Sequence, residues 1–191
     1  AEKLYKKARK LRRSIPIIQE RINHYKRRQI VILESELYLE NLLLNEWEEK
    51  NEIIKGINDI EEELDPLNNN KKTNYKTAKR KNDNKINPLE LISENNLTIQ
   101  VGRNHKQNEF ISLKNATSND MWFHAQECPG SHVVLKNSLG KAEEADFQLA
   151  LDLAAFFSRA KGNKKVPIVM TPANYLKRIK GNIAGTVSHR K

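Results

Sequence analysis

The sequence is poor in the residues on which several classes of protein depend. It contains a single cysteine, Cys128, which excludes an intramolecular disulfide and a cysteine-rich zinc cage and suits a reducing compartment such as the cytoplasm. No glycine-rich phosphate loop and no serine elbow occurs among its 191 residues. No run of about 18 apolar residues is present, so we expect no membrane span. No charged and then apolar leader opens the sequence.

The charge that is present is divided into blocks. The formal net charge is +10. Residues 1–28 carry 11 Lys and Arg against 2 acids, whereas residues 29–65 carry 2 against 12. Residues 66–90 carry 7 against 2, and residues 91–191 carry 14 against 8. A basic end, an acidic stretch and a basic remainder predict a polyanionic partner for part of the chain. Charge that serves solubility alone is the open alternative.

Residues 1–65 predict a long coiled-coil helical arm. Apolar residues recur in alternating steps of four and three from Leu4 to Leu43, which is the seam of a coiled coil. The seam keeps its phase across Pro16, so we favour a kinked, continuous helix over a new helix capped by Ser14. A helix of about 45 residues cannot bury its own stripe. The seam therefore predicts a partner, either a second copy of this chain in a homodimer or a helix outside this sequence.

Residues 66–88 predict a flexible basic linker, because Asn and Lys dominate and few large apolar residues are present. Residues 89–191 predict a small α+β domain, with a mixed β-sheet and one main amphipathic helix over 142–160. Pro167 indicates that its own strand lies near a sheet edge. Strands are expected at 97–101, 110–113, 120–124, 132–136 and 166–170, with shorter ones near 175–179 and 186–187.

The stretch that follows Gly102 predicts a polar loop dense in groups that bind phosphates and base edges. Arg103 presents a fork of donors, and Asn104, Gln107 and Asn108 present paired donors and acceptors. A loop whose amides satisfy its own backbone is the alternative. The candidate RNA-binding residues of the domain are Arg103, Asn104, Lys106, Gln107, Asn108, Trp122, His124, Ser131, His132, Lys177, Arg178 and Lys180.

Alternation along one predicted strand separates its aromatic residues. Trp122 and His124 share one face, and Phe123 points to the other face and into the core. Trp122 could stack a base, or it could be buried. His124, Cys128 and His132 are spaced four apart, but a Pro-Gly pair interrupts any helix that would align them, so we expect no metal site. We expect no cofactor and assign no catalytic residue, and a hydrolase that uses Cys128 with a histidine stays open.

Several separated motifs of the second half of the chain agree with one known pattern. They are Val101-Gly102-Arg103-Asn104, Gln107-Asn108-Glu109, Lys114-x-Ala116, Asp120-x-Trp122-Phe123-His124-Ala125, Pro129-Gly130-Ser131-His132-Val133, Ala154-Ala155-x-x-Ser158, Thr171 and Lys177-x-x-Lys180-Gly181. Together they resemble the NFACT-R domain, which closes the NFACT proteins, also known as fibronectin-binding protein A-like. The resemblance covers about residues 90–191. The first arm is similar to the descending half of the family's coiled coil.

The resemblance implies a function in ribosome-associated quality control in the cytoplasm. Members bind the large ribosomal subunit carrying peptidyl-tRNA and recruit tRNA, so that a tail grows on the stalled chain without mRNA. The R domain is regarded as an RNA-binding part, and the coiled coil reaches toward the protein of the stalk base. The amino-terminal domain needed for tailing is absent from this sequence, so we expect binding to tRNA and rRNA without enzymatic activity. A coiled-coil protein-interaction scaffold or a fibronectin-binding adhesin is the alternative.

One expectation joins these predictions. In it, the bend at Gly102 and the late basic residues converge on a single positive patch that grips a ribose-phosphate chain. Arg103, Lys106, Lys177, Arg178 and Lys180 would hold the phosphates.

Overall fold

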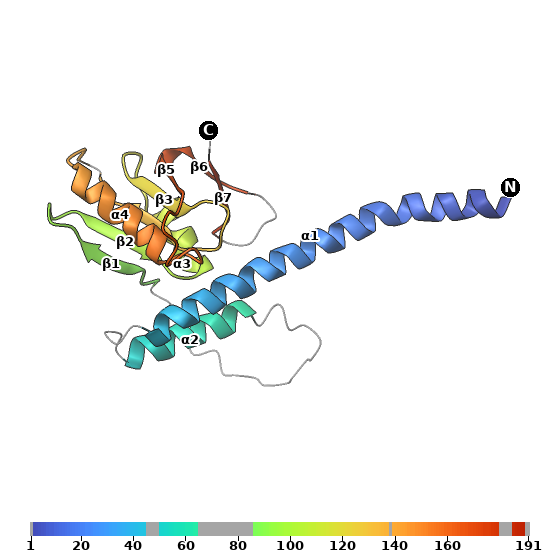
Figure 1. Ribbon diagram of the computed structural model, residues 1–191, viewed down its shortest axis with the longest axis horizontal. Helices are drawn as coiled ribbons and strands as arrows, with labels where there is room; N and C mark the ends of the chain where they lie inside the picture. Colours follow the sequence, from blue (N-terminus) through green and yellow to red (C-terminus); the bar gives the residue numbers. More distant parts are fainter. Residues whose placement is uncertain (1, 45–49, 65–85, 138, 180–184, 190–191) are drawn as a thin grey trace.

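A computed structural model describes residues 2–44, 50–64, 86–137, 139–179 and 185–189 of the chain. A long helical arm lies against a small sheet domain and extends well beyond it (Figure 1). The predicted fold class, α+β with a helical arm, is confirmed. The predicted linker lies almost entirely outside the described residues.

The arm begins with one continuous helix, α1 (Glu2–Leu44), which runs through Pro16. The hydroxyl of Ser14 donates a hydrogen bond of 2.8 Å to the carbonyl of Leu11. Ser14 is therefore an interior residue of the helix and caps no new one. The expectation of a continuous helix across Pro16 is confirmed.

A second helix, α2 (Lys50–Leu64), folds back along the second half of α1 (Figure 1). Tyr38 and Leu42 of α1 pack with Ile60 of α2 in a small buried core. The helices touch at Gly56, where an added Cβ would lie 2.5 Å from Cδ1 of Leu42 and 2.9 Å from Oη of Tyr38. The stripe that α2 buries lies one residue away from the predicted seam, whose residues Ile32, Leu39 and Leu43 are exposed by 37–67%, so α2 does not supply the partner of the seam.

The first half of α1 keeps its apolar seam exposed. Large side chains there are exposed by 41–74% of their area, and they are Leu4, Leu11, Ile15, Ile18, Ile22 and Tyr25. No described helix combines the length and the apolar composition that a bilayer crossing would need. This half of the seam still has no partner within the described ranges.

The domain is built on a five-stranded sheet with the order β1-β2-β4-β3-β5, and all four pairings are antiparallel, so the expectation of a mixed sheet is wrong. Four of these strands are predicted by the sequence, and the position of β5 at an edge agrees with Pro167. The first strand is not predicted. The bounds are β1 (Leu89–Ile92), β2 (Thr98–Gly102), β3 (Met121–Ala125), β4 (His132–Leu135) and β5 (Ile168–Pro172).

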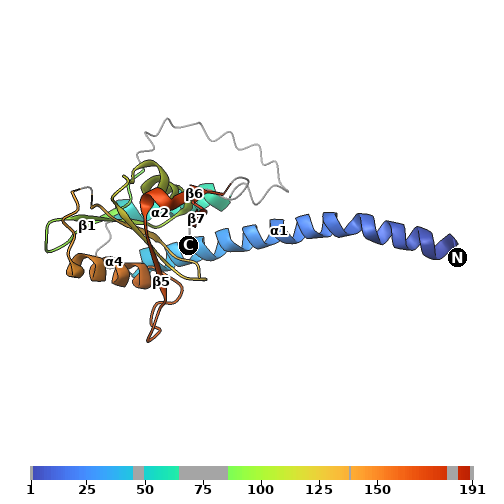
Figure 2. The same cartoon turned by 90° about the horizontal axis from the view of Figure 1, so that it is seen from above.

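Each face of the sheet has its own hydrophobic core. Helix α4 (Glu144–Phe156) covers one face, where Phe123 is fully buried (Figure 2). The other face carries Trp122, and it is covered by a π-helical turn and by a two-stranded ribbon of β6 (Leu176–Arg178) and β7 (Val187–His189). The short 3-10 helix η3 (Ala173–Tyr175) leads from β5 into that ribbon. The predicted separation of Trp122 from Phe123 is confirmed.

The loop and strand predicted for residues 103–113 are wrong, because both segments are helical. The side chain of Asn104 accepts a hydrogen bond of 2.8 Å from the backbone N–H of Gln107, which caps α3 (His105–Glu109). The chain then continues directly into the π-helical turn η2 (Phe110–Lys114). A short apolar run does not distinguish a strand from a buried helical turn.

The contact at Gly56 makes the helical hairpin sensitive to one side chain. We expect Gly56→Val to separate α2 from α1 and to lower the free energy of unfolding by about 1–3 kcal/mol, since valine has no room against Leu42 and Tyr38. Thermal unfolding and hydrogen exchange of the α1 amides near Leu42 measure this effect. Asn58→Val, which changes an exposed position of the same helix, is the control. Equal stability of the two variants would contradict this packing.

Asp120 precedes β3 and anchors it through a fully buried carboxylate. Burial raises the pKa of Asp120, but the hydrogen bond from Lys136 and the N–H of Thr117 outweigh burial and lower the pKa below its ordinary value. The ammonium of Lys136 lies 2.6 Å from Oδ2. Because the folded state lowers this pKa, its stabilisation is present at neutral pH and is lost as the pH falls below the ordinary value near ~4.

We therefore expect Asp120→Asn to lose about 2–4 kcal/mol of unfolding free energy at pH 7, since it leaves the Lys136 charge without its partner. The difference between the two proteins should shrink as the pH falls below the ordinary value near ~4, because the native carboxylate loses its charge on the way down. Urea titrations at several pH values measure it. A difference that stays constant from pH 7 to pH 2.5 would show that the charge of Asp120 contributes nothing.

Candidate functional site

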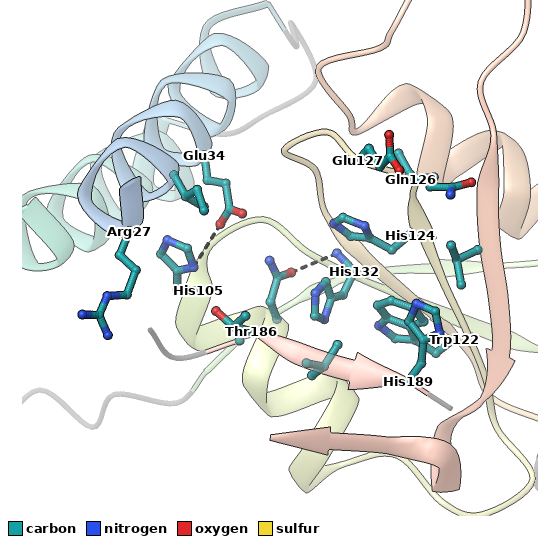
Figure 3. A pocket seen from close by; sticks show the side chains of 16 residues that line it. Arg27, Glu34, His105, Trp122, His124, Gln126, Glu127, His132, Thr186 and His189 are labelled. Carbon is teal, nitrogen blue, oxygen red and sulfur yellow. Dashed lines mark hydrogen bonds and ion pairs between the residues drawn. The ribbon is translucent and has the colours of Figure 1, made fainter. Parts of the chain in front are cut away.

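Four of the predicted site residues, Asn108, Trp122, His124 and His132, line a cavity of about 470 Å³ where the arm meets the domain (Figure 3). Helix α1 forms one wall with Arg27 and Glu34, and the domain forms the rest. Four of the five histidines of the sequence line this cavity. They are His105, His124, His132 and His189.

The three amide side chains that follow Gly102 are used inside the protein. Asn104 caps α3, the side-chain carbonyl of Gln107 accepts from the N–H of Arg103 at 3.0 Å, and that of Asn108 accepts from the N–H of His132 at 3.1 Å. All three side chains belong to buried residues. The prediction that they read base edges is therefore wrong for this arrangement, and the alternative, in which the amides satisfy local backbone groups, is what the structure shows.

The cations of the same segment face the helical hairpin. The ammonium of Lys106 lies 2.5 Å from the carboxylate of Glu62, and the guanidinium of Arg103 lies over the ring of Tyr38 at 5.4 Å from its centroid. The amide of Asn104 also donates to Asp59 at 3.2 Å. Burial raises the pKa of Asp59, and the positive charge of Lys106 opposes that rise. These residues dock the domain on the arm.

Three further contacts extend this docking surface along α1. Nδ1 of His105 lies 2.9 Å from the carboxylate of Glu34 (Figure 3). The guanidinium of Arg159 lies 3.1 Å from Glu36 and 3.7 Å from Glu40. The acidic block of the arm therefore pairs with basic residues of the domain, so part of the predicted polyanionic partner lies within the chain itself. Sequence reasoning missed this role, although the opposite charges of residues 29–65 and of the domain were its signal.

Aromatic rings cluster on the cavity side of the sheet. The ring of Trp122 stacks on that of His124 with centroids 5.7 Å apart and planes at 3°, which confirms that the two share a face. The edge of His132 approaches Trp122 at 5.1 Å, and Nδ1 of His132 lies 2.7 Å from the hydroxyl of Ser112. Trp122 is 3% exposed, so the buried alternative holds for its side chain.

Burial changes the protonation of two of these rings. It lowers the pKa of His124 against the opposing charge of Glu34, and it lowers the pKa of His132 well below the ordinary value. Both imidazoles are therefore neutral at neutral pH, with one donor and one acceptor each. Within the described ranges, no group of three His, Cys, Asp or Glu side chains could hold a metal ion.

The remaining predicted residues divide between buried and exposed positions. Ser131 is buried beside His132. Lys177 and Arg178 are exposed on β6, and Arg178 lies 3.5 Å from Glu109. Lys180 lies outside the described residues. The expectation of a single solvent-facing patch formed by the Gly102 bend and the late basic residues is wrong, because Arg103 and Lys106 face the arm.

Gly102 makes this arrangement possible, and we expect Gly102→Ala to disturb it. An added Cβ would collide with the side-chain oxygen of Asn108 and would lie 2.8 Å from the backbone nitrogen of the same residue. The free energy of unfolding should fall by about 1–3 kcal/mol, and the amides of α3 should exchange faster. Chemical denaturation and hydrogen exchange measure this, with Lys165→Ala in an exposed loop as the control. Unchanged exchange in α3 would contradict the close packing at Gly102.

Comparisons with known proteins place this domain in a family. Residues 88–188 match the model of the NFACT protein RNA binding domain. The curated protein Rqc2 homolog RqcH from Bacillus subtilis is 37% identical over 97 residues, which cover 51% of this chain and 17% of that protein. The protein of the same name from Streptococcus suis is 36% identical over 100 residues, which cover 52% and 18%. The match thus spans less than a fifth of the length of these relatives.

A solved structure extends the likeness to the arm. The C-terminal part of the fibronectin/fibrinogen-binding protein from Streptococcus suis matches 98% of this chain and 70% of that chain, with a TM-score of 0.75 and 26% identity. The family model covers more than half of the chain, and its residues include the capped helix α3 and the Trp122–His124 stack. The chain therefore belongs to the NFACT family.

Proposed function

We propose that this chain is the RNA-binding module of a ribosome-associated quality control factor. The match of residues 88–188 to the NFACT protein RNA binding domain carries the proposal, and the likeness to Rqc2 homologs supports the process. In this proposal the module acts in the cytoplasm, binds large ribosomal subunits carrying peptidyl-tRNA, and contacts tRNA and rRNA. It binds without catalysing a reaction.

The charge distribution of the folded chain supports an RNA partner. The acidic half of the arm is docked on the domain, whereas the described part of the basic block, residues 2–28, is almost entirely exposed along the free half of α1 (Figure 1). Arg and Lys side chains on such a surface contact phosphates without reading sequence. On the domain, Lys177 adds an exposed cation on β6.

We expect RNA affinity to fall steeply with salt concentration, because phosphate contacts release counterions. Changing Lys10, Arg12 and Arg13 together to Glu should weaken binding and reduce the slope of log affinity against log salt by about 2–3. Fluorescence anisotropy with labelled tRNA at several salt concentrations measures both effects. Lys164→Glu with Lys165→Glu, in an exposed loop of the domain, is the matched control. Affinity that ignores salt, or equal loss in both variants, would contradict this assignment.

The exposed seam of the free half of α1 supports a homodimer as a further partner. Two copies could bury the side chains of Ile15, Ile18 and Ile22, each of which is exposed by 41–63%. We expect sedimentation equilibrium to show a dimer whose dissociation constant rises at least tenfold in Ile15→Glu with Ile18→Glu. The control is Gln19→Glu, an exposed polar position of the same helix. A monomer at high protein concentration would reject the dimer.

A second candidate function is adhesion through the arm. It is favoured by the structural relative, which is a fibronectin/fibrinogen-binding protein. A pull-down with the intact chain separates the candidates. Enrichment of ribosomal RNA supports the RNA-binding module, whereas enrichment of extracellular matrix protein without RNA supports adhesion.

A further inference from the structure

The cavity between α1 and the sheet has the properties of a binding site rather than of a packing defect. Its volume of about 470 Å³ falls within the range of ~300–1,000 Å³ that is usual for ligand pockets. It is lined from three directions, by Arg27 and Glu34 of α1, by the strands of the sheet, and by β7 of the ribbon (Figure 3). It therefore exists only when the arm is docked on the domain.

One buried donor at this cavity lacks a partner. The side chain of Trp122 is 3% exposed and lines the cavity, and its Nε1–H makes no hydrogen bond within the described part of the chain. Buried polar groups in folded proteins almost always have partners, because an unpaired donor loses its hydration without compensation. An acceptor atom on a bound molecule would supply the hydrogen-bond partner that the indole N–H lacks.

The rings around Trp122 indicate a planar ligand. The ring of His124 lies parallel to that of Trp122, whereas the ring of His189 has its centroid 6.2 Å from that of Trp122 and is tilted by 38°. His124 is a partly exposed residue that lines the cavity, and a further ring can stack on its imidazole there. A planar ligand on that face would extend the parallel pair of Trp122 and His124 into the cavity.

The charge of the cavity argues against a metal ion or a free anion. The described residues contain no group of three metal-binding side chains, and the carboxylate of Glu34 lies among the lining residues. Burial lowers the pKa of His124 and His132, so both rings are uncharged at neutral pH, and the unpartnered donor at the cavity is the indole N–H of Trp122. A nucleobase has the matching properties, since it is planar and carries both donors and acceptors at its edge.

We propose that this cavity takes one unstacked nucleobase of a bound RNA strand, which stacks on His124 and accepts a hydrogen bond from the indole N–H of Trp122. The inference rests on the proposed RNA-binding function and adds a base-binding site to it. Arg27 stands at the end of the basic block of α1 and also lines the cavity. An RNA strand whose phosphates lie along the basic half of α1 would therefore reach the cavity at Arg27, where the base would enter.

The test uses the intact chain with Trp47→Phe, which leaves Trp122 as the single tryptophan. Two single-stranded RNA decamers are compared, one of adenylates and one with the same phosphates but with abasic nucleotides. We expect the adenylate decamer to change the fluorescence of Trp122 and to bind roughly 5- to 100-fold more tightly than the abasic one. Both decamers should show the same salt dependence.

Three variants locate the effect. His124→Ala should reduce the affinity for the adenylate decamer to that for the abasic one, and Trp122→Phe, which keeps a ring but removes the donor, should lose part of the difference. Affinity for the abasic decamer should be unchanged in both, which also shows that the variants are folded. Tyr175→Ala removes an exposed aromatic residue outside the cavity and should behave as the parent.

The outcomes separate this inference from the proposed function. Equal, salt-dependent binding of both decamers with no change at Trp122 would overturn the base-binding site and leave the RNA-binding function intact. Failure of the parent to bind either decamer or tRNA would reject the proposed function, and the base-binding site with it.

Discussion

The arrangement of this chain depends on docking between the acidic half of its arm and the segment that follows Gly102. Lys106 meets Glu62, His105 meets Glu34, and Asn104 meets Asp59. Exposed ion pairs contribute little individually, but these contacts are joined by the packing of Arg103 on Tyr38 and by partial burial. The docking orients the arm, closes one wall of the cavity and leaves the basic half of α1 free.

This division of charge gives each half of the arm its own role. A polyanionic stretch beside an RNA-binding domain would compete with RNA if it were free to move. Here the acidic stretch is paired with cations of the domain, and the basic residues 2–28 lie along the part of α1 that extends beyond the domain (Figure 1). The seam of that half is exposed as well, so one helix combines a surface for phosphates with a surface for another helix.

Local patterns predicted most elements of the fold. The seam across Pro16, the alternation around Trp122 and Phe123 and the apolar spacing of α4 each depend on side-chain period, which sequence carries directly. The segment over 103–113 was mispredicted because the cap formed by Asn104 is a local hydrogen bond whose partner cannot be read from residue type. The partners of the Asn104, Gln107 and Asn108 side chains were mispredicted for a related reason. An amide has the same hydrogen-bonding groups whether it binds RNA or the backbone of its own chain.

The sequence by itself determined most of the elements, the segregation of charge and the family resemblance, because these properties are recorded in residue type and spacing. Only the tertiary structure decided which charges meet within the chain and which remain exposed. It also gathered histidines from α3, β3, β4 and β7 around one cavity beside α1. These residues are distant in sequence, and their proximity follows from strand order and from docking of the arm, which no local pattern specifies.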